Sequence, residues 1–320
     1  MKRIKALALL SGGLDSILAT KLMVEQGIDV VAFNVTSPFC LCKKGGCGAV
    51  EAANQLGVEL KVVYAGLEYL KMVRNPKHGY GRNVNPCIDC RIFLLRKAKK
   101  IAKDLGASFI FTGEVLDERP MSQHYPAMKL IEEEAGLKNK ILRPLSARLL
   151  PETEIEKKGL VDRAKLLDIR GRSRKPQIKL AAEFNIKDYP CPAGGCLLTD
   201  KEFAIRMRDL FGHRKRCGLG DVNLLKVGRH FRLGENKIIV GRNEAENKKI
   251  AVGKSKYDYF FEVPVIAGPI TILQGRKTRK AVVTAAALTA FYSDAKNDNV
   301  TINFGRERLD KSITVQVPTR

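Results

Sequence analysis

The first half of the chain alternates short apolar runs with longer amphipathic segments. Each apolar run is long enough for one buried strand, and each amphipathic segment repeats its apolar residues with the period of a helix. The predicted strands cover residues 4–10, 30–35, 58–65, 108–113 and 140–145, and the predicted helices cover residues 14–26, 48–57 and 90–106. This alternation is typical of α/β proteins, in which a parallel sheet is covered by helices on both faces.

The pattern changes in the second half of the chain. Residues 151–215 are helical and basic, and they include the run RGRSRKP. After Gly218, six short strand-like runs are separated by turns, and two helix-like segments lie among them. We therefore predict an α/β domain over residues 1–165, a helical basic connector over 166–217 and a smaller C-terminal α+β domain over 218–320.

The stretch SGGLDS lies between the first predicted strand and the first predicted helix. Backbone N–H groups converge at such a glycine-rich turn, and the helix N-terminus adds partial positive charge, so the turn can hold phosphate. The stretch matches neither G-x-x-x-x-G-K-[ST] nor G-x-G-x-x-G, so N–H groups and hydroxyls must bind the phosphates. Asp15 is then available to a metal ion. The residues expected around the phosphates are Ser11, Gly12, Gly13, Asp15 and Ser16.

The carboxyl ends of the predicted strands indicate where a ligand binds. In open parallel sheets, ligands lie beyond these ends. SGGLDS, Phe33 and Gly113 all fall there. In the following stretch GEVLDERPMSQH, Arg119 could contact a substrate phosphate, and a solvated face is the alternative.

Charge narrows the class of partner. The 320 residues include 57 Lys and Arg against 34 Asp and Glu, a net charge of +23, which favours a polyanion and most simply a nucleic acid. Ribosome contact or solubility alone is the alternative. Apolar runs are too short for a membrane span, and the start MKRIKALALL leads into SGGLDS instead of a cleavage site. We expect a cytoplasmic protein with no membrane partner.

Eight cysteines in such a chain indicate metal or redox chemistry more than disulfides. Cys40, Cys42 and Cys47 have a spacing that is not standard for zinc, although three thiolates could form a second site. The others are Cys87 and Cys90 in CIDC, Cys191 and Cys196 in CPAGGC, and Cys217 outside these groups.

SGGLDS matches the pyrophosphatase loop of the N-type ATP pyrophosphatases, or PP-loop enzymes. NPCIDCR at residues 85–91, the stretch FTGEV and the segment at residues 142–160 resemble the tRNA 2-thiouridylases, and the resemblance covers roughly residues 1–200. It implies an adenine nucleotide alpha-hydrolase-like fold, ATP and Mg²⁺ as cofactors, and tRNA as the substrate. Backbone near Phe33 and Gly113 would hold the adenine.

The same resemblance assigns roles to cysteines. The thiouridylases carry one cysteine at the start of a helix and another in a glycine-flanked stretch downstream, and these positions fall on Cys90 and Cys196. Many of them carry Asp where this chain has Cys87. Three thiolates, Cys87, Cys90 and Cys196, resemble the iron–sulfur tRNA thiolases, in which three cysteines hold a [4Fe-4S] cluster and leave one iron open. The helix dipole at CIDC would favour thiolates.

Cys191 competes with Cys196 for the third position. Pro192 stiffens the chain beside Cys191, whereas Gly194 and Gly195 let the backbone approach a cluster closely. The family match also falls on Cys196, which we therefore favour.

The stretch IVGRNEAEN in the C-terminal region resembles the RNA-binding module of the NFACT ribosome-quality-control proteins. This resemblance implies that Arg and Lys contact RNA through phosphates more than through base edges. A generic basic accessory domain is the alternative.

These observations predict a tRNA sulfurtransferase with Asp15, Cys90 and Cys196 as catalytic residues. A flipped-out uridine is adenylated on a carbonyl oxygen, and sulfur from an open iron or from a persulfide on Cys196 then displaces AMP. The alternatives are a cluster-free thiouridylase with Cys90 as nucleophile, an RNA-binding accessory protein, and another adenylating enzyme such as an amidotransferase or lysidine synthetase. The replaced oxygen (O2 or O4), the sulfur donor (sulfide or a persulfide carrier) and the presence of a homodimer stay open.

Overall fold

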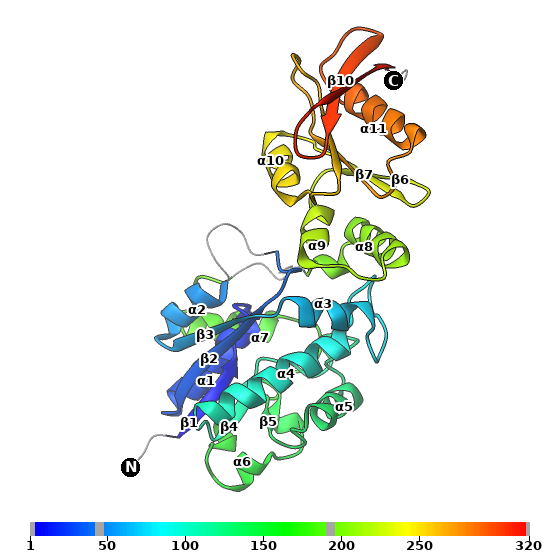
Figure 1. Ribbon diagram of the computed structural model, residues 1–320. Coiled ribbons are helices and arrows are strands. Elements are labelled where there is room, and N and C mark those ends of the chain that lie inside the picture. Colours follow the sequence, from blue (N-terminus) through cyan, green and yellow to red (C-terminus); the bar gives the residue numbers. More distant parts are fainter. Residues whose placement is uncertain (1–3, 42–47, 190–195, 318–320) are drawn as a thin grey trace. The chain divides into compact units, whose positions relative to one another are not determined.

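The computed structural model describes residues 4–41, 48–189 and 196–317 (Figure 1). The chain forms two compact units, Met1–Asp200 and Lys201–Arg320. Because these units are defined by packing alone, the three-part division expected at residues 165 and 217 stays a prediction.

The first unit contains a five-stranded parallel sheet, which confirms the predicted α/β fold class. Its strand order is β3–β2–β1–β4–β5, with β1 at the centre. The SGGLDS loop therefore leaves the middle of the sheet. The strands are β1 (Lys5–Leu9), β2 (Asp29–Thr36), β3 (Glu59–Tyr64), β4 (Phe109–Thr112) and β5 (Ile141–Leu142).

Helices cover both faces of this sheet (Figure 1). Because side chains alternate along β1, Ala6 and Ala8 join the core beneath α1, whereas Leu7 joins the core beneath α4. Helix α4 starts at Cys87, three residues earlier than the sequence pattern predicts. The helices are α1 (Leu14–Glu25), α2 (Gly48–Leu56), α3 (Leu67–Arg74), α4 (Cys87–Asp104), α5 (Tyr125–Ala135), α6 (Glu154–Lys157) and α7 (Lys175–Glu183).

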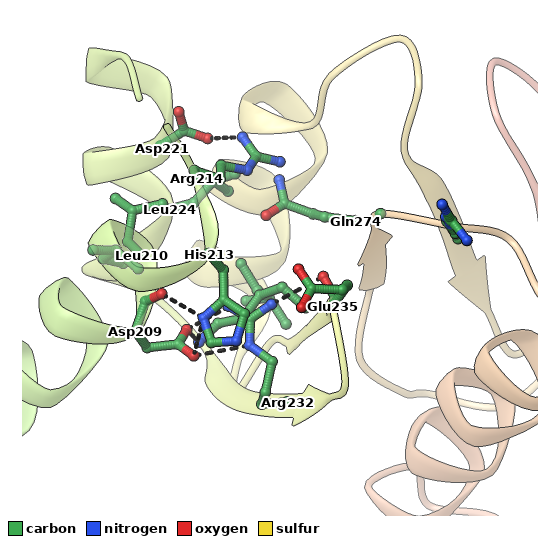
Figure 2. A pocket seen from close by; sticks show the side chains of 14 residues that line it. Asp209, Leu210, His213, Arg214, Asp221, Leu224, Arg232, Glu235 and Gln274 are labelled. Atoms are coloured by element: carbon green, nitrogen blue, oxygen red, sulfur yellow. Dashed lines mark hydrogen bonds and ion pairs between the residues drawn. The ribbon is translucent and has the colours of Figure 1, made fainter. Parts of the chain in front are cut away.

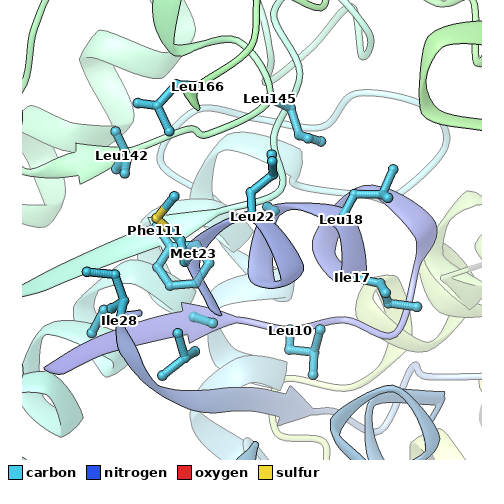
Figure 3. Close-up of a cluster of buried hydrophobic side chains, with 14 of the residues drawn as sticks. Leu10, Ile17, Leu18, Leu22, Met23, Ile28, Phe111, Leu142, Leu145 and Leu166 are labelled. Atoms are coloured by element: carbon cyan, nitrogen blue, oxygen red, sulfur yellow. The ribbon is translucent and has the colours of Figure 1, made fainter. Parts of the chain in front are cut away.

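Helix α1 is buried around most of its circumference. It packs on the sheet and also against α2 and α7, so even Ser16 and Thr20 are buried. Figure 3 shows Leu18 and Leu22 of α1 beside Leu145 in this core. A helix held on several sides gives its N-terminal loop a fixed position.

The second unit is the smaller α+β part, built on an antiparallel sheet of order β11–β10–β8–β9–β7–β6. The sheet has the six strands that we expected. The first of them begins later than expected, because Leu224 and Leu225 lie in a helix. The strands are β6 (Arg229–Leu233), β7 (Asn236–Val240), β8 (Tyr259–Glu262), β9 (Thr271–Gln274), β10 (Asn299–Gly305) and β11 (Lys311–Gln316). The helices are α8 (Lys201–His213), α9 (Leu219–Leu225), α10 (Glu244–Gly253) and α11 (Arg279–Phe291).

An ionic centre joins α8 to the β6–β7 hairpin. Asp209 accepts two hydrogen bonds from Arg232, at 2.8 and 2.6 Å, and one from Lys237 at 2.6 Å. Burial alone would raise the pKa of Asp209, but these cations outweigh it and lower that pKa to about 2. Figure 2 shows Asp209 and Arg232 at a cavity of about 320 Å³ that α8, α9, β6, β7 and β9 enclose. The charges on this side of the cavity are therefore paired.

Two glycines of the first unit permit backbone segments to touch. A Cβ on Gly12, whose φ is +81°, would lie 2.3 Å from the Gly48 carbonyl carbon, and a Cβ on Gly113 would lie 2.5 Å from Ser16 N. A Cβ on Gly13 would meet only Ser11 Oγ, at 3.5 Å. The loop therefore needs glycine for close packing at Gly12 and Gly113, but not at Gly13.

We predict that Gly12→Ala and Gly113→Ala each lower the free energy of unfolding of the first unit by about 2 kcal/mol or more, because backbone must move. Gly13→Ala is the matched control in the same loop and should change it by less than about 1 kcal/mol. Urea unfolding followed by far-UV circular dichroism measures both. Equal destabilisation by all three would contradict this account of the packing.

Candidate nucleotide and thiol site

The SGGLDS loop is organised around the hydroxyl of Ser16. Ser16 Oγ accepts a hydrogen bond from Ser11 N at 3.2 Å and donates one to Gly13 O at 2.8 Å. Gly13 is the N-cap of α1, and no side chain caps this helix end. The N–H groups of the first turn of α1 are therefore available to an anion.

Beside this turn lies a group of polar atoms that the fold buries without satisfying. Asp15 Oδ1, Arg174 Nε and both amide atoms of Gln177 are buried, and none has a hydrogen-bond partner among the described residues. The Gln177 side chain adjoins Asp15, but no regular hydrogen bond joins them. Such atoms cost free energy unless a bound group satisfies them, so their gathering indicates a ligand.

Opposing effects act on the Asp15 carboxyl. Burial raises its pKa above the ordinary value, and the positive charges of Arg174 and Arg119 offset this only in part. Asp15 in turn raises the pKa of Glu118, after the larger effect of burial. A cation bound at Asp15 would favour the carboxylate.

We did not identify Arg174 or Gln177 as site residues from the sequence. Arg174 belongs to RGRSRKP, which we interpreted only as a basic run, and Gln177 lies in the first turn of α7. A usable signal was present, because Pro176 marks a helix start and so places both residues at a helix N-terminus.

Of the residues expected at the adenine, Gly113 directly follows β4, whereas Phe33 lies within β2, opposite Leu9 at the end of β1. The Phe33 side chain is buried against α4, and its carbonyl accepts a hydrogen bond from Leu10 N at 3.0 Å. Gly113 touches the backbone of Asp15 and Ser16. Their contact with adenine stays a prediction.

Four thiols from three segments of the chain gather in the first unit. Cys87 and Cys90 open α4, and Cys90 Sγ accepts a hydrogen bond from Tyr69 Oη at 3.0 Å. Charges on Cys90, Cys40 and Cys87 would each raise the pKa of Cys196, so these sulfurs lie within electrostatic range of one another. The structure thus brings Cys196 to CIDC.

Cys40 differs from the sequence expectation. From the sequence we considered it only for a second site with Cys42 and Cys47, and the structure places it opposite Cys196 in an isolated antiparallel bridge. Cys42, Cys47 and Cys191 are outside the described residues. The choice between Cys191 and Cys196 therefore stays a prediction.

Burial opposes the effect that we expected from the helix dipole at CIDC. Burial raises the pKa of Cys87 and of Cys90, and Arg91 offsets this effect only in part. Burial also raises the pKa of Cys196, to about 12. Partial burial of these cysteines therefore works against the thiolate form, and at Cys87 and Cys90 it opposes the dipole of α4.

These thiols suit an iron–sulfur cluster in kind, since thiolates are its usual ligands. Within residues 4–41, 48–189 and 196–317, however, no three cysteine, histidine or acidic side chains lie close enough to hold a metal ion. Binding a cluster would require the sulfurs to turn towards one another and to lose their protons.

Two protein-family models match this chain. A family model described as "Thiamine biosynthesis protein (ThiI)" matches residues 2–179. The chain belongs to the ThiI family. A second model, described as "NFACT protein RNA binding domain", matches residues 228–319 of this ThiI-family chain.

Relatives of this ThiI-family chain are tRNA-modifying enzymes. It is 24% identical to the tRNA-specific 2-thiouridylase MnmA of Clostridium perfringens, over 98% of this chain and 94% of that protein. It is 27% identical to a probable tRNA sulfurtransferase of Thermococcus kodakarensis, over 50% of this chain and 40% of that protein. The recognition of a PP-loop tRNA thiolation enzyme and the predicted enzyme class, a tRNA sulfurtransferase, are confirmed.

Solved structures show weaker likeness. A 4-thiouridine synthetase–RNA complex with bound ATP has a TM-score of 0.35 and 22% identity, covering 65% of this chain and 51% of that one. The U34-tRNA thiolase NcsA from Methanococcus maripaludis, with its [4Fe-4S] cluster, has a TM-score of 0.34 and 19% identity, covering 70% and 71%. Because these scores are low, the fold assignment depends on the sheet topology and the family match. No helix in the described ranges is long and apolar enough to cross a membrane.

The second unit of this ThiI-family chain carries a basic aromatic surface. Residues 201–320 contain 24 Lys and Arg against 12 Asp and Glu. Around the Tyr259 ring, the cationic groups of Lys277, Arg306 and Lys311 lie 5.5, 5.6 and 5.3 Å from the ring centroid. The ring attracts these cations, but they repel one another. An anion between them would relieve that repulsion.

We predict that iodoacetamide alkylates Cys196 more slowly in the folded protein than in the urea-unfolded chain at neutral pH, because its raised pKa leaves less thiolate. Below that pKa the thiolate fraction rises with pH, so the rate should increase about tenfold per pH unit from about pH 7 to about pH 9. Peptide mass spectrometry measures the modified fraction. A folded-state rate that levels off below about pH 9 would refute the raised pKa.

Proposed function

We propose that this chain catalyses ATP-dependent thiolation of a uridine in tRNA. A carbonyl oxygen of the base attacks the α-phosphate of ATP and releases pyrophosphate, and sulfur then displaces AMP. The main support is the group of unsatisfied polar atoms around Asp15, at an uncapped helix N-terminus, beside four gathered thiols.

In the proposed site, residues of the loop bind the phosphates. The N–H groups of Gly12 and Gly13 and the hydroxyls of Ser11 and Ser16 contact phosphate oxygens. Asp15 would hold Mg²⁺, which when bound would neutralise part of the charge of the leaving pyrophosphate.

Two arginines and an amide complete the pocket. Arg174 and Arg119 stabilise the negative charge that develops on the leaving group, and Gln177 orients the Asp15 carboxylate. Arg119 also partly offsets the rise that burial causes in the pKa of Cys87, so the proposed phosphate site and Cys87 lie within range of one charge.

Sulfur chemistry belongs to the thiols at CIDC and Cys196. Cys87, Cys90 and Cys196 would hold a [4Fe-4S] cluster, which when bound supplies an open iron for hydrosulfide. Without a cluster, Cys196 carries a persulfide and Cys90 is the nucleophile. The Tyr69 hydroxyl donates to Cys90 Sγ and would stabilise its thiolate in either case.

The second unit would hold the tRNA through its phosphates. The cations around Tyr259 and the excess of Lys and Arg in residues 201–320 support this role. The cytoplasmic location, the sulfur donor and a homodimer stay predictions from the sequence. A non-catalytic RNA-binding protein is the competing reading, and ATP–pyrophosphate exchange separates the two.

We predict that Asp15→Asn lowers ATP–pyrophosphate exchange by about a hundredfold or more, because the amide cannot hold the metal ion or its charge. The matched control is Asp117→Asn, which removes a surface ion pair with Arg170 at 2.7 Å and should leave exchange near the wild-type rate. The thermal midpoint of Asp15→Asn should not fall, because the change removes a buried charge. Full exchange by Asp15→Asn would exclude the proposed role of this residue.

We predict that the double variant Arg306→Ala, Lys311→Ala weakens tRNA binding and reduces the slope of log K against log salt by about two, because two phosphate contacts are lost. Lys248→Ala is the control, since Lys248 pairs with Glu244 on α10. Filter binding at several salt concentrations measures the slope. An unchanged slope would place the RNA contact elsewhere.

A further inference from the structure

We propose that Cys40 is the resolving thiol of the sulfur-transfer site. In this role Cys40 attacks Cys196 when Cys196 carries a sulfane sulfur, and it releases that sulfur as hydrosulfide within the site. The inference deepens the proposed function and depends on it, and it adds a nucleophile outside the CIDC motif.

The backbone places Cys40 and Cys196 face to face. They are partners in an antiparallel bridge, and Leu197 N donates to Phe39 O at 3.0 Å. Because the hydrogen bond joins the flanking residues, the two cysteines form a non-hydrogen-bonded pair. The Cα atoms of such a pair are about 4.5 Å apart, and their side chains are closer than in the hydrogen-bonded kind. A disulfide needs Cα atoms about 4.4–6.8 Å apart, so this backbone permits one.

Buried neighbours fix both strands of the bridge. Phe39, beside Cys40, and Leu198, two residues after Cys196, are both fully buried. Ser37 N donates to Cys40 Sγ at 3.2 Å, which orients that sulfur. The bridge is therefore a packed feature of the first unit.

The other two thiols are arranged differently. Cys87 and Cys90 both belong to the first turn of α4, and Cys90 Sγ is engaged with the Tyr69 hydroxyl. Only Cys40 lies across from Cys196 in a backbone pairing within the described residues. Cys90 and Cys40 both lie within electrostatic range of Cys196, but of the two only Cys40 is held opposite it by the backbone, and this pairing makes Cys40 our candidate for the thiol that attacks Cys196 Sγ.

The chemistry balances in two thiol exchanges. The Cys196 thiolate attacks the outer sulfur of a low-molecular-weight persulfide, takes up that sulfur and releases the donor thiolate. The Cys40 thiolate then attacks Cys196 Sγ, the bond from Sγ to the outer sulfur breaks, and a Cys40–Cys196 disulfide forms. The outer sulfur leaves as HS⁻ and accepts the two electrons that the cysteines lose. HS⁻ can attack the adenylated uridine, and an external dithiol reduces the disulfide.

The experiment uses the full-length protein, free of iron and kept anaerobic, with glutathione persulfide as the sulfur donor. The wild type should release about one HS⁻ per chain and gain a Cys40–Cys196 disulfide, seen by non-reducing peptide mass spectrometry. Cys40→Ser should keep the extra sulfur on Cys196, and its rate of HS⁻ release should fall by about tenfold or more. Cys217→Ser, in the second unit, is the control and should behave as the wild type does.

Several results would overturn the proposal. Release of HS⁻ from Cys40→Ser at the wild-type rate would do so, as would a disulfide from Cys196 to Cys87 or Cys90. The wild-type peptide map gives this answer even where Cys40→Ser folds poorly. Cys40→Ala, checked by near-UV circular dichroism, supplies a second variant without a hydroxyl.

Thiolation assays on the same samples separate this inference from the proposed function. With free sulfide as donor, wild type and Cys40→Ser should thiolate tRNA equally, whereas with the persulfide only the wild type should. Equal thiolation with the persulfide would refute the role of Cys40. Release of HS⁻ with disulfide formation but no tRNA thiolation from either donor would refute the cluster-free form of the proposed function and leave the role of Cys40 intact; no thiolation after the cluster is reconstituted as well would refute the proposed function itself.

Discussion

The candidate site depends on direct contact between backbone segments at the end of the parallel sheet. The end of β4 at Gly113 touches the first turn of α1, and Gly12 touches the start of α2. Side chains at these places would separate the segments, and the loop could not keep its N–H groups converged. Since α1 is held by the sheet, α2 and α7 together, the loop and Asp15 are fixed before any ligand arrives.

A buried ion network positions the thiol side of the site. Arg143 is buried between Glu114 and Glu132, with which it forms hydrogen-bonded ion pairs, and Arg91 approaches Glu114 at 3.4 Å. Burial would raise the pKa of Glu114, but Arg91 and Arg143 lower it overall, so the carboxylate stays charged. Removing one member would leave an uncompensated charge, which makes this link between β4, α4 and α5 hard to rearrange. Arg91 follows Cys90 directly, so the network also fixes the first turn of α4.

The sequence predicted what local patterns encode. Apolar runs identified the strands, and SGGLDS identified the loop because its glycines and hydroxyls are contiguous. The pairing of Cys40 with Cys196 joins residues far apart in the chain, and neither has a neighbour that signals the contact. Gln177 could not be predicted either, because its burial beside Asp15 depends on where α7 packs, and no local pattern encodes that packing. At CIDC the helix dipole could be inferred from the sequence, whereas the burial that raises the pKa of Cys87 and of Cys90 could not.

Arg119 acts on both parts of the candidate site. Burial raises the pKa of Asp15 and of Cys87, and the charge of Arg119 offsets part of that rise at both groups, so one cation acts on the proposed phosphate site and on a thiol. An anion that binds beside Asp15 neutralises part of that charge, and a Cys87 thiolate then becomes less favourable. Thermodynamic reciprocity requires that the Cys87 thiolate weakens binding of the anion by the same factor. An anion bound beside Asp15 would therefore oppose ionisation of Cys87, and its departure would remove that opposition.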